Sequence, residues 1–97
     1  MRQLEPRKDT EIDGSGDVVV SGEVDFQRLE IDGSGDYWAL DLTSARGVLD
    51  INGSGDADVF VTEELRIRIN GSGDVHYAGG AQLITEINGS GDIDAVD

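Results

Sequence analysis

The sequence predicts an all-β protein, a parallel β-helix or β-roll solenoid of about five coils that are each 18–20 residues long. The first observation behind this prediction is a repeat. The tetrapeptide Gly-Ser-Gly-Asp begins at Gly14, Gly33, Gly53, Gly71 and Gly89, so the copies are 19, 20, 18 and 18 residues apart. The second observation is that apolar and polar residues alternate on both sides of each copy, which is typical of β-strands and not of helices.

The strand before each turn carries an isoleucine two residues before the first glycine. These isoleucines are Ile12, Ile31, Ile51, Ile69 and Ile87. The residue two positions further back is aliphatic or Thr, and the residue between them is polar or charged. Stacked coils would turn the isoleucines into an internal ladder. We therefore expect truncation of Ile51, in the central coil, to cost more stability than truncation of Ile12 in the first coil.

Each turn is followed by a second strand, whose inward positions lie directly after the Asp and two residues later. Glycine in the turn permits backbone angles that are closed to other residues. A more variable return completes the coil. A unit this short cannot bury its own apolar face, whereas stacked units bury one another. An antiparallel meander with hairpin turns is the alternative. It ranks second because side chains of one kind recur at the same position of each repeat, which parallel stacking turns into ladders and hairpins would not require.

The chain is interpreted as a single β-solenoid domain, residues 1–97, with an N-terminal lead-in at 1–9 and five coils at 10–97. It has no cysteine, and no apolar run is long enough to cross a bilayer, so we expect neither disulfides nor membrane insertion. The first ten residues lack the apolar segment of a signal peptide. The net charge of −14 opposes binding to nucleic acid.

Three copies of the repeat, INGSGDADV, INGSGDVHY and INGSGDIDA, resemble the repeat of the putative auto-transporter adhesin, head GIN domain family. The resemblance extends from about Thr10 to Asp97. It implies a parallel β-solenoid and, because most members are exported bacterial proteins, a place outside the cytoplasm or in the cell envelope. The function of the family is largely unknown, and the resemblance brings no catalytic residues.

Stacking would place the aspartates of the turns in one column, and these are candidate cation ligands: Asp17, Asp36, Asp56, Asp74 and Asp92. Carboxylate oxygens suit calcium, so a calcium-binding repeat module is one hypothesis, and no other cofactor is indicated. We prefer the alternative that each carboxylate accepts hydrogen bonds from backbone N–H groups of its own turn. A nucleotide site is disfavoured, because its glycine fingerprint lies between a strand and a helix.

Two further columns have structural interpretations. The column before the turns consists of Asp13, Asp32, Asn52, Asn70 and Asn88. Its three amides are expected to hydrogen-bond along the stack. The only histidine, His76, is expected between Asp58 and Asp94. We favour a surface ion pair there over a metal-binding or pH-sensitive trio.

Trp38, Leu40 and Phe60 are the candidates for an interaction surface. The alternation directs Trp38 outward, and it puts Leu40 and Phe60 in a nominally outward column with Val96. An outward apolar patch on a solenoid marks a contact surface, and Trp is a common anchor residue. The alternative is a bend after the second strand that turns Leu40 and Phe60 inward.

These features favour a non-enzymatic structural or adhesion-like module that presents rigid acidic faces to a protein or a surface glycan. Unpaired strand edges at the two ends would allow a homo-oligomer or an end-to-end assembly. The second hypothesis is the calcium-binding module. The third is a polysaccharide-active β-helix enzyme, which is disfavoured because returns of a few residues build no deep groove for paired catalytic carboxylates.

Overall fold

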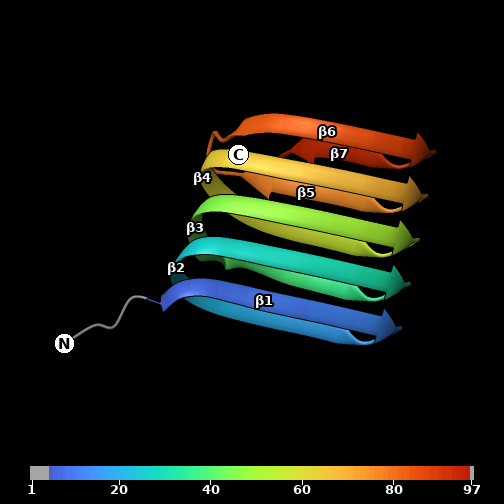
Figure 1. Cartoon of the computed structure of the whole chain (residues 1–97), viewed down its shortest axis with the longest axis horizontal. Helices are drawn as coiled ribbons and strands as arrows, with labels where there is room; N and C mark the ends of the chain where they lie inside the picture. The colour runs from blue at the N-terminus through green and yellow to red at the C-terminus, as the bar shows by residue number, and fades with distance from the viewer. Residues whose placement is uncertain (1–4, 97) are drawn as a thin grey trace.

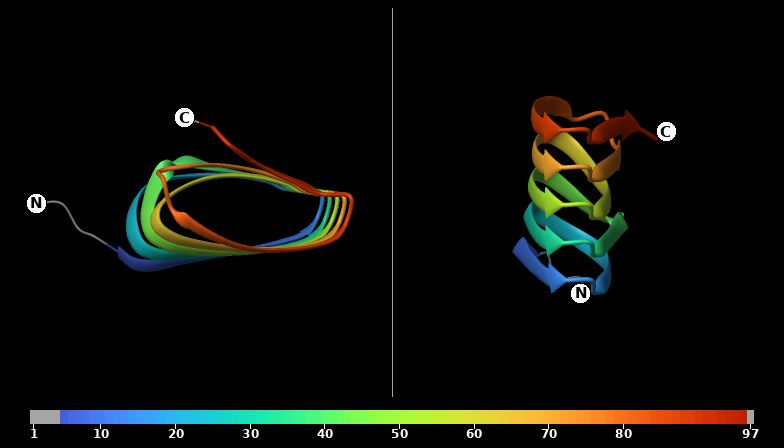
Figure 2. Two further views of the ribbon diagram at one scale, coloured as in Figure 1. Left: turned by 90° about the horizontal axis from the view of Figure 1, so that it is seen from above. Right: turned by 90° about the vertical axis from the view of Figure 1, so that its right-hand side faces the viewer.

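In the computed structural model, which describes residues 5–96, the chain forms a parallel β-solenoid of about five coils (Figure 1). The coils stack along one axis, and each is a flattened loop that is closed at its narrow edge by a Gly-Ser-Gly turn (Figure 2). The strands are β1 (Glu5–Gly14), β2 (Asp17–Gly33), β3 (Asp36–Gly53), β4 (Asp56–Gly71), β5 (Asp74–Ala78), β6 (Gln82–Gly89) and β7 (Asp92–Ala95). Among the residues described, there is no helix with the length and apolar character needed to cross a membrane.

Every strand pair in this part of the chain is parallel, in the order β1-β2-β3-β4-β5-β7, with β6 also paired to β4. The predicted fold class is confirmed, and the antiparallel meander is excluded. Strands β2, β3 and β4 each run around a whole coil. Strand β1 already begins at Glu5, so residues 5–9 belong to the first coil and not to a lead-in.

The isoleucine ladder forms as predicted, because each isoleucine pairs in register with the isoleucine of the next coil. The buried apolar core consists of Ile12, Val24, Leu29, Ile31, Tyr37, Ala39, Leu42, Leu49, Ile51, Ala57, Val59, Val61, Leu65, Ile67, Ile69 and Val75. The core is thus built mainly from aliphatic side chains of the three middle coils, which supply the hydrophobic stabilisation of the stack.

The turns repeat one set of backbone hydrogen bonds between coils. The N–H of Ser54 donates to the carbonyl oxygen of Gly33 at 3.0 Å, and the N–H of Asp56 donates to that of Gly35 at 3.2 Å. The first glycine of the turn has a positive φ, 123° at Gly53, which L side chains rarely adopt. A Cβ added at Gly53 would also collide with the carbonyl oxygen of Gly33. Glycine is therefore needed both for the turn angle and for the close approach of neighbouring coils.

The core contains a polar cluster that was not predicted from the sequence. The Nε2 atom of Gln27 donates to Ser44 Oγ at 2.8 Å, and the hydroxyl of Tyr37 donates to Gln27 Oε1 at 3.0 Å. Ser44 Oγ in turn donates to the carbonyl oxygen of Phe60 at 3.2 Å. Burial raises the pKa of Tyr37, which keeps its hydroxyl protonated as a donor. The cluster joins β2, β3 and β4 and satisfies these buried polar groups.

Candidate functional site

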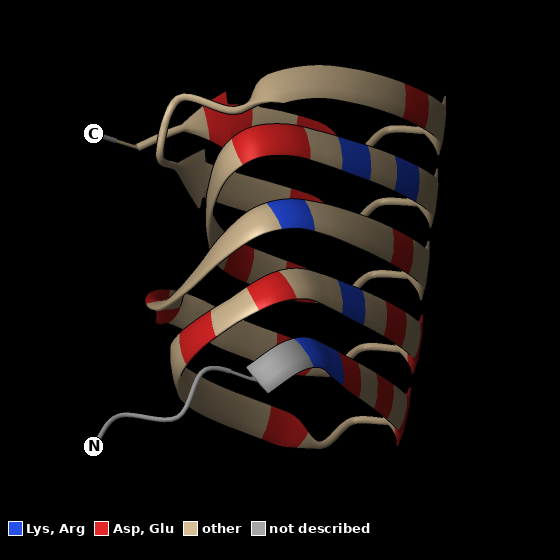
Figure 3. Cartoon of the chain, turned by 60° about the vertical axis from the view of Figure 1, so that its left-hand side comes forward, with Lys and Arg blue, Asp and Glu red and all other residues tan. Residues whose placement is uncertain are grey.

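Charge divides the surface of the solenoid into two faces. The post-turn face consists of the segments directly after the turns, residues 17–21, 36–41, 56–60, 74–78 and 92–95. The pre-turn face consists of the segments before the turns, residues 7–13, 26–32, 46–52, 64–70 and 82–88. All Lys and Arg residues that the structure describes lie on the pre-turn face (Figure 3). The charged residues of the post-turn face are aspartates, with His76 beside them, so this face repels anionic ligands.

The aspartates of the turns stack in one column in register, from Asp17 to Asp92. Partial burial raises the pKa of the Asp56 carboxyl, and the charges of Asp36 and Asp74 on the neighbouring coils raise it further. A hydrogen bond from the backbone of Asp74 lowers the same pKa. This backbone partner lies one coil away. From the sequence we had expected a partner in the turn of Asp56 itself. The column is an array of mutually repelling charges that coil-to-coil hydrogen bonds partly relieve.

Within residues 5–96, no three His, Asp or Glu side chains converge in a way that could hold a metal ion. Each coil contributes one carboxylate to the column, about 4.8 Å from the next. A calcium ion needs about six to eight oxygen ligands at roughly 2.3–2.6 Å. The calcium hypothesis for Asp17, Asp36, Asp56, Asp74 and Asp92 therefore has no geometric support in the described part of the chain.

His76 lies between Asp58 and Asp94 in the register of β4, β5 and β7. Its Nδ1 atom is 3.2 Å from Asp58 Oδ1, and the two side chains are 42% and 32% exposed. A pair this open to solvent contributes little to stability. The geometry fits the surface ion pair that we favoured from the sequence.

The column before the turns forms the expected hydrogen-bonded ladder. Asn88 Nδ2 donates to Asn70 Oδ1 at 3.1 Å, and Asn70 Nδ2 donates to Asn52 Oδ1 at 3.0 Å. Asn52 Nδ2 donates to Asp32 Oδ1 at 3.2 Å. All three bonds point toward the N-terminal coil, because the carboxylate of Asp32 can only accept. The ladder is a structural spine along the edge of the stack.

The largest exposed apolar side chains of the post-turn face lie close together in the first two coils. Val19 is 72% exposed, Trp38 is 55% exposed and Leu40 is 42% exposed. Val19 and Trp38 are register partners on β2 and β3, so their side chains are neighbours on one face of the sheet. We call Val19, Trp38 and Leu40 the apolar patch. The sequence indicated Trp38 and Leu40; Val19 could have been added from the register column that it shares with Trp38.

Phe60 is not part of this patch. The pairing of β3 with β4 passes from Ala39 and Val59 directly to Thr43 and Phe60, so residues 40–42 bulge out of the ladder. Phe60 therefore lies beside Thr43, is half-buried, and shares no column with Leu40. The prediction that Leu40 and Phe60 share an outward column was wrong. The alternative, a bend that turns Leu40 inward, was also wrong, because Leu40 stays exposed. The longest repeat step, 20 residues between Gly33 and Gly53, was the signal that extra residues bulge from this coil.

A family model, described as putative auto-transporter adhesin, head GIN domain, matches residues 7–81. The chain belongs to this family. The resemblance seen in the repeats is thereby confirmed, and the description of the family as adhesins agrees with a non-enzymatic role without establishing one. No curated protein matches the chain.

Solved structures with the same fold come from Parabacteroides species. A putative lipid binding protein from Parabacteroides distasonis is 33% identical, with a TM-score of 0.93 over 95% of this chain and 37% of its own. A putative adhesin from the same species is 28% identical, with a TM-score of 0.92 over 96% of this chain and 40% of its own. A putative adhesin from Parabacteroides merdae is 23% identical, with a TM-score of 0.94, and supports the fold alone. The head GIN chain thus spans 37–40% of the length of these solved chains.

Proposed function

We propose that this head GIN chain is a non-enzymatic, adhesion-like module that binds a neutral or basic partner, a surface glycan or a protein, through the apolar patch. The observation that carries the proposal is the 55% exposure of Trp38 on β3, flanked in register by Val19 and Asp58. An exposed indole on a rigid sheet is a preorganised anchor, because little side-chain and backbone freedom is lost when a partner covers it.

The surroundings of the patch define the chemistry of the partner. Asp58 lies beside Trp38, and Asp41 follows Leu40, so carboxylate oxygens border the apolar surface. They would accept hydrogen bonds from sugar hydroxyl groups or from the cationic side chains of a protein. An anionic glycan or lipid would meet aspartates and no Lys or Arg on this face.

The absence of catalysis is supported by the shape of the coils. The segments between the described strands are two or three residues long, so they add no loops that would wall a substrate groove. A flat surface of this kind suits contact with a partner better than the enclosure of a reacting group, which catalysis requires.

The test uses the fluorescence of Trp38, the only tryptophan of the chain. An array of neutral and cationic glycans and a set of basic proteins would be screened, and each hit titrated against the fluorescence. We expect a change in Trp38 emission on binding and a loss of binding by about tenfold or more in Val19→Ala. Trp38→Ala has no tryptophan, so its binding is measured by isothermal titration calorimetry, where we expect a loss of the same size.

The matched control is Ile84→Ala, which removes an apolar side chain of 45% exposure from the pre-turn face and should leave binding unchanged. Binding that survives Trp38→Ala, or equal losses in the control, would contradict the assignment of the patch. Failure of every neutral and cationic probe to bind would contradict the proposed function itself.

A further inference from the structure

Trp38 lies among carboxylates on the side of the solenoid. Asp36 precedes it by two residues on β3, so both side chains lie on one face of the sheet, about 6.6 Å apart along the strand. Asp58 is its register partner on β4, about 4.8 Å away across the sheet. Asp56 is in turn the register partner of Asp36 and lies two residues before Asp58. We call these four residues the Trp–Asp square. Strands β3 and β4 have further strands on both sides, so the square is part of a lateral surface.

The three carboxylates of the square repel one another. Partial burial raises the pKa of Asp56, and the charges of Asp36, Asp74 and Asp58 raise it further. All Lys and Arg residues that the structure describes lie on the pre-turn face, so none of them pairs with these aspartates (Figure 3). His76 contacts Asp58 from the next coil, on the side away from Trp38. A cation placed over the square would therefore relieve a repulsion that the fold itself leaves in place.

An indole beside carboxylates suits a guanidinium group. The planar guanidinium stacks on an aromatic face, and its N–H groups donate to carboxylates at the edge of the ring. A cation is attracted when it lies within about 6 Å of the ring centroid, and there it is also within reach of Asp36 and Asp58. A metal ion is a poorer fit, because within residues 5–96 no three His, Asp or Glu side chains converge.

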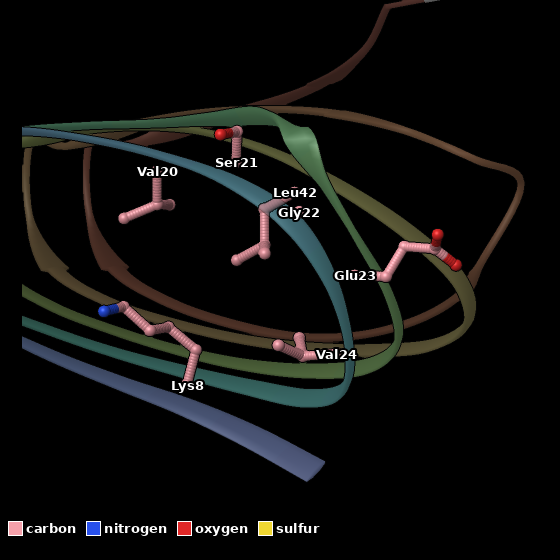
Figure 4. Close-up of a pocket in the computed structure, with 7 residues that line it drawn as sticks. All are labelled: Lys8, Val20, Ser21, Gly22, Glu23, Val24 and Leu42. Atoms are coloured by element: carbon pink, nitrogen blue, oxygen red, sulfur yellow. The ribbon is translucent and has the colours of Figure 1, made fainter. Parts of the chain in front are cut away.

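The hollow shown in Figure 4 offers a cation a less favourable place. It has a volume of about 360 Å³ and is lined by residues of β1, β2 and β3. Its charged lining residues are Lys8, which extends along it, and Glu23, so their charges cancel (Figure 4). The charges of the Trp–Asp square all have one sign. A guanidinium group is therefore attracted more strongly to the post-turn face than to this hollow.

We propose that the post-turn face binds an arginine side chain of a basic protein, with the guanidinium group stacked on the indole of Trp38 and donating to Asp36 and Asp58. This inference rests on the proposed function and narrows its partner to a protein with an exposed arginine-rich segment. Charge complementarity selects this occupant. On the segments 17–21, 36–41 and 56–60 the charged residues are all aspartates: Asp17, Asp36, Asp41, Asp56 and Asp58. A neutral sugar would cover Trp38 but leave their repulsion unrelieved, and an acidic partner would increase it.

The experiment titrates the protein with tetra-arginine, acetylated and amidated at its ends, and follows the fluorescence of Trp38. Tetra-citrulline with the same ends is the matched probe, because it keeps the planar shape of the side chain and loses the charge. Tetra-lysine keeps the charge and loses the planar group. We expect tetra-citrulline to bind at least about tenfold more weakly than tetra-arginine, and tetra-lysine about threefold more weakly. The affinity for tetra-arginine should fall as sodium chloride screens the aspartates.

Variants of the protein separate this site from general attraction by the net charge of −14. Asp36→Asn and Asp58→Asn each remove a charge beside Trp38 and should weaken tetra-arginine binding about fivefold. The control is Asp94→Asn, which removes an equal charge from the same face. It lies three strand spacings from Trp38, about 14 Å, which exceeds the screening length of about 8 Å at physiological salt, so the loss should stay below about twofold.

The aromatic ring is tested by Trp38→Leu, which keeps an apolar side chain at this position. Isothermal titration calorimetry should show about threefold weaker binding of tetra-arginine to this variant. Equal binding of tetra-citrulline and tetra-arginine, or equal losses in Asp36→Asn and Asp94→Asn with the fold intact by circular dichroism, would overturn the inference. Neutral glycans that bind through Trp38 while tetra-arginine does not bind would also overturn it, and in that case the proposed function itself would stand.

Discussion

The first and last coils carry isoleucine at the same position of the repeat, yet these two side chains differ in burial. Ile12 in the first coil is 4% exposed, whereas Ile87 in the last coil is 39% exposed. The difference arises because the cover for each isoleucine is the second glycine of the following turn, which the first coil has in Gly35 and the last coil lacks among the described residues. The solenoid is therefore directional, because each coil completes the core of the coil before it.

This direction bears on one expectation from the sequence. We expected truncation of Ile12, in the terminal coil, to cost less than truncation of Ile51, and that order stays a prediction. The structure adds that Ile87 is the most exposed isoleucine of the ladder. In a stack whose stability is a sum of nearest-neighbour contacts, the position of a coil decides the cost of a change as much as the residue type does.

The largest expected effect is at the first glycine of a turn. Gly53→Ala would place a Cβ against the carbonyl oxygen of Gly33 and impose a φ of 123° on alanine. We expect a loss of about 4 kcal/mol or more, because backbone strain adds to a collision that no side chain can relieve. Gly14→Ala keeps a positive φ of 93° but meets no atoms, so only the strain of about 1–3 kcal/mol applies. Urea unfolding of both variants measures the difference, and equal losses would show that coil contact plays no part.

The next effect concerns the isoleucine ladder. Ile51→Ala should lower the free energy of unfolding by about 2–5 kcal/mol, because its side chain is fully buried between two coils. Ile87→Ala should cost about 1 kcal/mol or less, since part of its side chain is already in water. Thermal and urea denaturation of the two variants would test this order. A cost for Ile87→Ala as large as that for Ile51→Ala would mean that something covers the last coil in solution.

A smaller effect is expected in the amide ladder. Asn70→Asp removes the donor to Asn52 Oδ1 in the middle of the stack and should cost about 1–2 kcal/mol. Asn88→Asp removes the donor to Asn70 at an exposed position, where water replaces the lost partner, and should cost about 0.5 kcal/mol. The two melting temperatures, measured at one pH and salt concentration, give the comparison. A larger loss at Asn88 than at Asn70 would contradict the directional stack.

The coil count, the isoleucine ladder and the asparagine ladder were all predictable from the sequence. Each follows from one fact, the near-constant period of the repeat. In a parallel stack, residues at the same position of successive repeats become register partners on neighbouring coils. The outward direction of Trp38 followed from the alternation of a regular strand. These predictions needed no knowledge of how side chains pack.

Other features depend on packing between coils and could not be predicted. The cluster of Gln27, Tyr37 and Ser44 forms because a buried amide of one coil meets a phenol and a hydroxyl of the next. The return segments do not repeat one sequence pattern, so the sequence does not show which of their residues become neighbours. The bulge at residues 40–42 separates Leu40 from Phe60, and a repeat length of 20 does not say where the extra residues lie. The unequal cover of Ile12 and Ile87 depends on the direction in which these side chains lean toward the neighbouring coil.

The smallest effect compares the middle and the end of the aspartate column. Asp56 has aspartates on both sides, whereas Asp17 has a register neighbour on one side only among the described residues. Burial and the charges of Asp36 and Asp74 raise the pKa of Asp56 above its ordinary value of 3.8, so near that value the folded state binds more protons than the unfolded chain. The contribution of Asp56 to stability therefore rises as the pH falls from neutrality through the raised pKa, and it levels off below 3.8.

Asp56→Asn should therefore stabilise the protein at neutral pH by a few tenths of a kcal/mol, because the side chain is largely exposed and the repulsion is screened by water. The gain should vanish below the ordinary pKa and should shrink as sodium chloride approaches molar concentration, where the screening length falls to about 3 Å. Asp17→Asn, with one charged neighbour, should give about half the gain. Melting temperatures of the two variants across pH and salt test the argument. A lower melting temperature for Asp56→Asn at neutral pH would mean that the hydrogen bond from the backbone of Asp74 outweighs the repulsion along the column.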